Sequence, residues 1–249
     1  MIILQTTHPT NTNITNHFAK GCNGKKIKIE DYIFNKNDLI ASYGILRGTG
    51  EIFKKSQNFY YIDHGYIGAS KRSFSQGSTV IEDFDGYFRV VHNDYFGFKN
   101  LNFDSKRLEK LNLEFKQQRT NGEYIILSEP SKHITSFFNL NNWVEETIKK
   151  IKKHTDRKIF LHNKSSPIPL DLLLERAWAF VSFQSTAGFK SMLKGVPAHF
   201  TYKSLEYLNP LEKIESGNIN HDIFLSLSYN QWSLKEFSSG EAWEYISKI

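Results

Sequence analysis

An aspartate and a histidine stand side by side directly after an apolar segment of the chain. The segment Asn58 to Asp63 (NFYYID) is strand-like, and His64, Gly65 and Tyr66 follow it. A carboxylate at such a place can remove a proton from a hydroxyl group, and an imidazole can do the same or donate to a phosphate. Ligands of open α/β sheets bind beyond the carboxyl ends of strands. We therefore predict Asp63 and His64 as catalytic residues; the alternative is an Asp-capped turn with a surface histidine.

A second group of candidate residues follows the apolar run Ala179 to Phe183. Ser185 and Thr186 interrupt this run, and helix-type spacing begins at Ala187. Backbone N–H groups at a helix N-terminus, together with hydroxyl groups, favour an anion such as a phosphate. Serine and threonine are also ordinary residues at the start of a helix. The pattern thus predicts either a phosphate site or a plain crossover from strand to helix.

Three further positions are candidates for a ligand-binding surface. His8 opens the polar segment Thr7 to Asn16, which leaves a first apolar strand and is read as a loop. Tyr66 belongs to an aromatic loop, and Arg89 either faces a ligand or pairs with neighbouring acids. The turn Gly44 to Gly50 (GILRGTG) matches neither the dinucleotide fingerprint nor the phosphate loop. It permits close approach of a ligand to the backbone, or is a plain turn into a helix.

The elements that must position these residues alternate between strand and helix along the chain. This order predicts an α/β fold with parallel sheets and right-handed crossovers. Gly195 and Pro197 are placed to end one helix, and Ser233 with Glu236 has the spacing of a capping box for the last helix. The expected strands are 1–6, 27–32, 38–43, 58–63, 83–91, 124–128, 158–162, 179–183, 196–202 and 223–227. The expected helices are 16–21, 51–56, the second half of 101–118, 143–154, 170–177, 187–194 and one from 234 onward.

Composition limits the class of protein. The chain has 249 residues, a net charge of +6 and a sequence pI near 9.1, which predicts attraction to polyanions; a Lys- and Asn-rich composition from an AT-rich genome is the alternative. The single cysteine, Cys22, excludes an internal disulfide and a multi-cysteine zinc site. No apolar run reaches the roughly 20 residues that cross a bilayer. We expect a reducing, cytoplasmic setting without integral membrane association.

These elements and motifs resemble the GT-B glycosyltransferases, and among them the capsule-polysaccharide-type transferases and small transferase-like phage proteins. The segments that carry the resemblance are the Asp-His-Gly strand end, FVSFQSTAGFKSMLKGVPA and the tail SYNQWSLKEFSSGEAWEYI. The resemblance implies two Rossmann-like domains that face each other across a cleft, with a C-terminal helix crossing back. We expect an acceptor domain at 1–118, a nucleotide-sugar domain at 119–232 and a helix at 233–249 that packs on the first domain.

The resemblance also implies roles for individual residues. Ser185 and Thr186, with Gly188 in the same turn, would hold the diphosphate of a donor, and Lys164 would neutralise its charge. His162 stands near a place where relatives often carry an arginine. Asp63 or His64 would be the general base, while His8, Tyr66 and Arg89 would lie toward the acceptor. No metal and no bound cofactor are implied, and a UDP-sugar is the expected donor.

The resulting hypothesis is a glycosyltransferase that uses a nucleotide-sugar. Its acceptor is a glycan or a hydroxymethylated base in phage DNA, in which case the enzyme works in the host cytoplasm. Enzymes that modify a base in a duplex flip it out of the stack, and aromatic side chains such as Tyr66 would assist. The alternatives are a non-catalytic nucleotide- or nucleic-acid-binding protein on a transferase scaffold, and a sugar-nucleotide epimerase.

Overall fold

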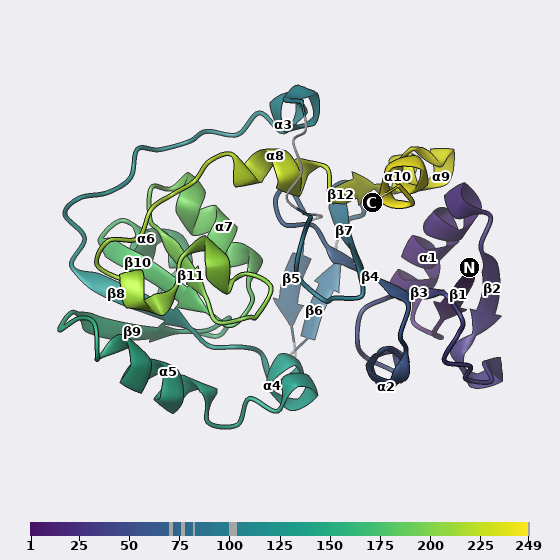
Figure 1. Cartoon of the computed structure of the whole chain (residues 1–249), viewed down its shortest axis with the longest axis horizontal. Coiled ribbons are helices and arrows are strands. Elements are labelled where there is room, and N and C mark those ends of the chain that lie inside the picture. The colour runs from purple at the N-terminus through teal and green to yellow at the C-terminus, as the bar shows by residue number, and fades with distance from the viewer. Residues whose placement is uncertain (70–71, 76–77, 82, 100–103, 249) are drawn as a thin grey trace. The chain divides into compact units, whose positions relative to one another are not determined.

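The chain folds into two α/β units. The computed structural model describes residues 1–69, 72–75, 78–81, 83–99 and 104–248. Unit 1 comprises Met1–Arg107 together with Phe224–Ile249, and unit 2 comprises Leu108–Ile223 (Figure 1). Both chain termini therefore belong to unit 1. The α/β fold class predicted from the alternation of elements is confirmed.

Unit 1 is built on a six-stranded sheet with the strand order β12-β7-β4-β3-β1-β2. The four strands β4, β3, β1 and β2 are parallel, whereas β7 runs antiparallel to both β4 and β12. The antiparallel edge departs from the purely parallel sheet expected. The strand bounds are β1 Ile2–Gln5, β2 Lys25–Lys28, β3 Ile40–Tyr43, β4 Phe59–His64, β7 Tyr87–His92 and β12 Gln231–Ser233. A separate hairpin joins β5 (Arg72–Ser75) to β6 (Ser78–Ile81).

Helices cover both faces of the six-stranded sheet (Figure 1). On one face, Phe18 of α1 meets Phe237 of α9 edge to face, with ring centroids 5.2 Å apart. On the other face, Phe53 of α2 packs against Phe59 and Tyr61 of β4. The helix bounds are α1 Pro9–Cys22, α2 Thr49–Lys55, α9 Leu234–Ser239 and α10 Glu241–Ile246, with a 3-10 turn η1 at Ile29–Asp31. The chain passes between the units within α3 (Lys106–Lys110) and α8 (Ile223–Ser228).

Gly21 marks the closest approach of α1 to α9, and its replacement by alanine tests that packing. A Cβ atom at this position would lie 1.8 Å from the carbonyl oxygen of Phe237. A backbone atom cannot swing aside as a side chain can, so we expect Gly21→Ala to lower the free energy of unfolding by about 2 kcal/mol or more. The measurement is urea unfolding. Lys20→Ala, at an exposed position of the same helix, should stay within about 0.5 kcal/mol of the parent; equal effects would contradict the packing argument.

Unit 2 is built on a four-stranded, fully parallel sheet with the order β11-β10-β8-β9. Trp143 and Ile151 of α5 cover one face, and Leu173 and Leu174 of α6 belong to the core of the other. The strands are β8 Tyr124–Ser128, β9 Lys158–His162, β10 Ala177–Ser182 and β11 Ala198–Phe200. The helices are α4 Lys132–Phe138, α5 Trp143–Ile151, α6 Leu170–Leu174 and α7 Thr186–Leu193, with 3-10 turns η2 at Glu206–Leu208 and η3 at Leu211–Lys213.

Two local signals for helix ends are confirmed. Gly195 has a φ of 79°, in the left-handed region that favours glycine, and α7 ends just before it. Ser233 and Glu236 form the predicted capping box at the start of α9. Both signals depend on residues close in sequence, so they can be read without knowledge of the rest of the fold.

Other element predictions were wrong where short apolar or polar runs are ambiguous. The segment 223–227, expected as a strand, is the helix α8, in which Ile223, Phe224 and Leu227 are buried. A short apolar run cannot be assigned by periodicity alone. The loop expected at 7–16 already contains the start of α1 at Pro9, because buried Ile14 anchors its apolar face. The C-terminal helix is divided at Gly240. The helix expected in the second half of 101–118 is wrong, because residues 111–118 are not helical and the helix of this segment is α3 at Lys106–Lys110.

The boundaries between the two units follow Arg107 and Ile223, whereas the domain limits expected from the sequence are 118 and 232. The extended segment before β8 belongs to unit 2, because the Lys116 backbone N–H donates to Leu193 O and that of Arg119 donates to Gly195 O, at 3.0 and 2.8 Å. At the other end, α9 and α10 pack on α1 of unit 1. The C-terminal segment thus returns to the unit in which the chain begins.

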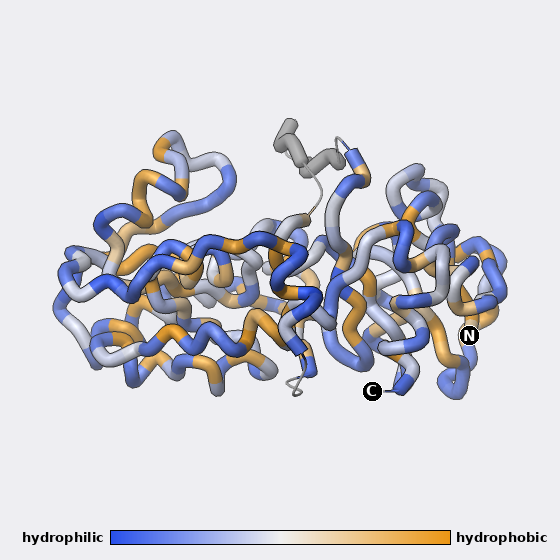
Figure 2. The backbone as a smooth tube through the Cα atoms, turned by 90° about the horizontal axis from the view of Figure 1, so that it is seen from above, coloured by the Kyte–Doolittle hydropathy of each residue, from blue (hydrophilic) through white to orange (hydrophobic). Residues whose placement is uncertain are grey.

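Polar and apolar residues alternate in short stretches along the backbone (Figure 2). Within the described residues, none of the helices has the length and apolar character needed to cross a membrane.

Candidate functional site

Both sheets contain a point at which the strand order reverses. In unit 1 the chain goes from β1 to its neighbour β2 and then returns to β3 on the other side of β1. In unit 2 it goes from β8 to β9 and returns to β10 on the other side of β8. Ligands of open α/β sheets bind at such switch points, outside the carboxyl ends of the strands. These two edges are therefore where a ligand is expected. His8 lies at the first of them as the half-buried N-cap residue of α1, with no side-chain capping bond.

A chain of polar contacts runs along the carboxyl edge of the sheet in unit 1. The backbone N–H of Thr6 donates to Asn11 Oδ1 at 2.9 Å, and Asn11 Nδ2 donates to Tyr43 O at 2.8 Å and to Ser42 Oγ at 3.1 Å. The Tyr43 hydroxyl lies 3.1 Å from His64 Nε2. These contacts tie together the ends of β1, β3 and β4. They place the His64 imidazole, which is half-buried, at the edge where a ligand is expected.

Asp63 is engaged by its neighbours rather than available as a base. Its Oδ2 accepts from the Tyr61 hydroxyl at 2.7 Å and from Arg89 at 2.8 Å, and its Oδ1 accepts from the His64 backbone N–H at 2.8 Å. Burial raises the pKa of Asp63, but Arg89, His64 and these hydrogen bonds outweigh it and lower the pKa to about 2. A carboxylate with this pKa is a weak proton acceptor at neutral pH. Of the two candidate bases, His64 therefore fits better.

Arg89 is a buried partner of Asp63. Its side chain is 5% exposed; besides the ion pair it donates to His64 O at 2.5 Å and to Tyr95 O at 3.3 Å. Its guanidinium lies over the ring of Phe96, 4.6 Å from the centroid. The sequence left open whether Arg89 faces a ligand or pairs with neighbouring acids. The structure shows an ion pair, and the partner is Asp63 rather than an acid close to Arg89 in the sequence.

Tyr66 lies in the core of unit 1. Only 3% of its surface is exposed, and its hydroxyl donates to Gly97 O at 2.7 Å. Its ring meets that of Phe96, itself buried, edge to face. In this conformation neither ring is accessible to a nucleic-acid base, and both serve to pack the aromatic cluster around Arg89.

Ser185 and Thr186 lie at the switch point of unit 2, as the sequence predicted for the start of a helix. Ser185 is the N-cap of α7, and its Oγ accepts from the Ala187 backbone N–H at 3.2 Å. Thr186 is the first helical residue. A Cβ atom on Gly188 would lie 2.5 Å from Cζ of Phe200, so this glycine is needed for packing of α7 against β11.

Ser182 is a further polar residue at this edge, and sequence reasoning missed it. It is the last residue of β10 and is 1% exposed, and its Oγ has no hydrogen-bond partner among the described residues. Leaving a buried hydroxyl unpaired costs about 1–3 kcal/mol, so such a group requires an explanation. Phe180 packs in the core on the α6 side of the sheet, and alternation along the strand directs Ser182 to the same side. The only signal in the sequence is a serine that ends an otherwise apolar strand.

His162 and Lys164 follow β9, which is separated from β10 by β8. His162 pairs with Ser128 across the strands, and burial lowers its pKa, which disfavours the charged form that would neutralise a phosphate. Asn163 Nδ2 donates to Glu129 Oε2 at 2.6 Å. Lys164 is exposed.

A polar hollow of about 410 Å³ opens along α4, just beyond β8, and is lined by Pro130, Lys132, Thr135, Ser136, Asn139 and Asn141.

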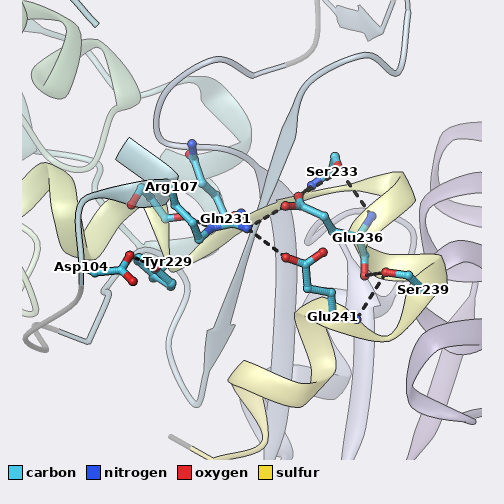
Figure 3. A network of polar contacts seen from close by, with 9 residues as sticks. Asp104, Arg107, Tyr229, Gln231, Ser233, Glu236, Ser239 and Glu241 are labelled. Atoms are coloured by element: carbon cyan, nitrogen blue, oxygen red, sulfur yellow. Dashed lines mark hydrogen bonds and ion pairs between the residues drawn. The ribbon is translucent and has the colours of Figure 1, made fainter. Parts of the chain in front are cut away.

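The polar network drawn in Figure 3 surrounds Arg107 and holds the C-terminal segment in unit 1. Arg107 donates to Glu236 Oε1 at 2.6 Å and to Gln231 O at 2.9 Å, and its guanidinium lies 3.9 Å from the centroid of Trp232. Nearby, Tyr229 donates to Asp104 at 2.5 Å. Arg107 is buried, and these contacts give it a part in holding the fold of unit 1.

Comparison with known proteins finds similar folds among solved structures. No family profile matches the sequence, and no curated protein sequence matches it. Among solved structures, the chain is similar to KpsC of Thermosulfurimonas dismutans, a β-Kdo 2,4 transferase, with a TM-score of 0.51 and 8% identity over 94% of this chain and 92% of the other. A β-Kdo 2,7 transferase of the same organism has a TM-score of 0.49 and 13% sequence identity, over 100% of this chain and 99% of the other. At 8% identity, the likeness to the first of these structures shows a shared fold alone.

Proposed function

We propose that this protein is a glycosyltransferase that moves a sugar from a nucleotide-sugar donor to a hydroxyl group of an acceptor. The observation that carries the proposal is the likeness in fold to the β-Kdo 2,4 transferase, which extends over 94% of the chain. Fold alone does not define function. The residues at the two switch points supply the chemistry that the transfer needs.

The donor phosphates are assigned to the start of α7. The positive dipole end of this eight-residue helix favours an anion, and the helix begins at the switch point of its sheet. The unpaired Ser182 Oγ supports the assignment, because a phosphate oxygen would satisfy this buried hydroxyl. The same groups would stabilise the negative charge that develops on the leaving phosphate. Lys164 is proposed as an additional counter-charge.

His64 is assigned the role of general base. The acceptor hydroxyl gives its proton to the imidazole, and its oxygen forms a bond to the anomeric carbon of the sugar. The bond from that carbon to the phosphate oxygen breaks, and the nucleotide leaves with the electron pair. Tyr43, 3.1 Å from His64 Nε2, holds the imidazole, and Asp63 and Arg89 hold the His64 backbone through its N–H and its carbonyl oxygen.

The acceptor is proposed to be a glycan, in keeping with the sugar-transferring relative in fold. The net charge of +6 also suits DNA, as in the hypothesis of a hydroxymethylated base as acceptor. Binding to DNA through phosphates should weaken steeply as salt rises. Binding that is absent, or that salt leaves unchanged, favours the glycan.

A thermal-shift screen with UDP, GDP, CMP and ADP tests the proposed donor site. UDP is the expected ligand, and any bound nucleotide should raise Tm, since a ligand at about 100 times its Kd adds roughly 2.7 kcal/mol of stability.

Ser182→Ala should weaken the binding of that nucleotide at least about tenfold without destabilising the free protein. Ser191→Ala is the matched control: it removes a buried hydroxyl of α7 that already donates to Gly188 O at 2.7 Å, so it should leave the Kd unchanged. If no nucleotide raises Tm, the proposal loses its donor site.

A further inference from the structure

Strand β9 forms an edge of the sheet in unit 2, and its apolar side chains are open to solvent. It stands last in the strand order, so β8 is its one neighbour within the described part of the chain (Figure 1). Phe160 and Leu161 are 41% and 50% exposed. The Phe160 ring packs on that of Tyr124 in β8, with ring centroids 4.5 Å apart. An exposed apolar edge strand is a template for pairing with another strand.

The other edges of the two large sheets are protected. Strand β11, at the far edge of the same sheet, is buried along its whole length. In unit 1, β12 is largely buried, and β2 carries Lys25, Lys26 and Lys28, whose charges oppose pairing with a second strand. Strand β9 has one lysine, Lys158, at its start, and it pairs with β8 without a register shift. This edge is therefore the one available for pairing.

The main-chain groups of β9 that face away from β8 are those of Ile159 and Leu161. The Glu129 N–H donates to His162 O at 2.9 Å, so the main chain of His162 faces β8. The N–H and C=O groups of successive residues in a strand point to opposite sides, and those of Phe160 therefore face β8 as well. The outward groups of Ile159 and Leu161 have no strand beside them in the part of the chain that the structure describes.

We propose that two copies of this protein form a symmetric dimer by antiparallel pairing of their β9 strands. With Phe160 opposite Phe160 of the partner subunit, Ile159 comes opposite Leu161 of the partner subunit. These opposite residues exchange both hydrogen bonds, and the two-fold axis repeats the pair. This register pairs both outward-facing residues of the strand and joins the two sheets into one. The assembly is independent of the proposed sugar transfer.

The side chains of β9 suit pairing with a second copy. The two Phe160 rings meet at the axis, in a pair whose side chains approach closely, and aromatic pairs at such positions stabilise a sheet. Lys158 comes opposite His162 of the partner subunit. Burial lowers the pKa of His162, so at neutral pH the lysine meets an uncharged ring. Two-fold pairing closes on itself, so it gives a dimer rather than a fibre.

Sedimentation velocity of the full chain over a range of concentrations tests the dimer. A small interface binds weakly, so the dimer should predominate at about 100 μM and dissociate on dilution to about 1 μM. Phe160→Lys and Phe160→Glu each place two like charges opposite each other, and each should weaken self-association at least about tenfold. Tyr207→Lys is the matched control: it replaces an aromatic residue that is 56% exposed in η2, beside β11, and should leave self-association unchanged.

A mixture of the two Phe160 variants separates repulsion at the axis from a defect in folding. It brings a lysine opposite a glutamate, so it should recover the dimer that neither variant forms alone. Leu161→Pro is an independent check, because it removes an outward N–H, at a place where an edge strand tolerates proline. It should abolish the dimer without unfolding the chain, and it decides the case if a charged variant is unfolded by circular dichroism.

Four results would overturn the dimer. The parent chain could remain monomeric at about 100 μM, the upper end of the range for a weak interface, or form larger assemblies in its place. The dimer could tolerate the changes at Phe160 and Leu161, or lose as much affinity through Tyr207→Lys. A mixture of folded Phe160 variants that stays monomeric would contradict the pairing of Phe160 with its own copy.

Discussion

Replacing Arg89 by methionine is expected to lower the free energy of unfolding by about 3–5 kcal/mol, the cost of leaving a buried charge without its partner. Asp63 would keep its burial and lose the guanidinium 2.8 Å away, and the carbonyl oxygens of His64 and Tyr95 would lose a donor. Methionine keeps much of the volume beneath the Phe96 ring, so loss of packing contributes less. The measurement is urea unfolding followed by circular dichroism.

An exposed ion pair serves as the control. Arg176 pairs with Glu123 on the surface of unit 2, where the two side chains are 67% and 53% exposed. Arg176→Met should cost at most about 1 kcal/mol, because surface pairs are well solvated. Equal losses for Arg89→Met and Arg176→Met would show that burial does not govern the Asp63 pair.

The same pair predicts a dependence of stability on pH. The pKa of Asp63 is lowered to about 2 in the folded protein, from 3.8. The unfolded chain therefore takes up a proton first as pH falls, and the stabilising contribution, present above about pH 4, is lost as pH approaches 2. The shift corresponds to about 2 kcal/mol. Asp63→Asn should remove this part of the acid dependence; an unchanged acid limb in the variant would contradict the assignment.

Replacing His64 by glutamine is expected to lower kcat about 10²- to 10⁴-fold, the usual contribution of a positioned general base. The variant should stay folded, because the half-buried imidazole lies at the strand end, where its polar contact is with the Tyr43 hydroxyl. The measurement is release of the nucleotide from whichever donor the thermal-shift screen identifies, across a range of pH. The ascending limb of the pH profile should disappear with the imidazole.

Two comparisons identify the loss as catalytic rather than structural. The Tm increase given by the nucleotide should be unchanged in His64→Gln, because its binding site is assigned to unit 2. Tyr43→Phe keeps the imidazole and removes the hydroxyl 3.1 Å from Nε2, so its kcat should fall less than that of His64→Gln. A kcat for His64→Gln within about twofold of the parent would remove His64 from the mechanism.

Much of the candidate site was readable from residues close in sequence. Asp63 stands where an apolar run ends, and Ser185 and Gly195 bound α7 as their types predict, whereas Ser182 was not singled out. These signals need only the preference of a residue for a cap, a turn or a buried strand. The roles within each group were not readable, because Asp63 and His64 look equally suited to act as a base until Arg89 is placed beside one of them.

The amino-acid sequence by itself determined the alternation of strand and helix, the α/β class and the positions of several helix ends, because these depend on local propensity and hydrophobic periodicity. Only the tertiary structure decided the antiparallel edge at β7 and β12, the helical state of 223–228 and the burial of Arg89 and Tyr66. It also left Ser182 Oγ without a hydrogen-bond partner among the residues that the structure describes. Each of these depends on contacts between residues far apart in the chain, and the energy of a buried charge or hydroxyl is set by such neighbours rather than by its own segment.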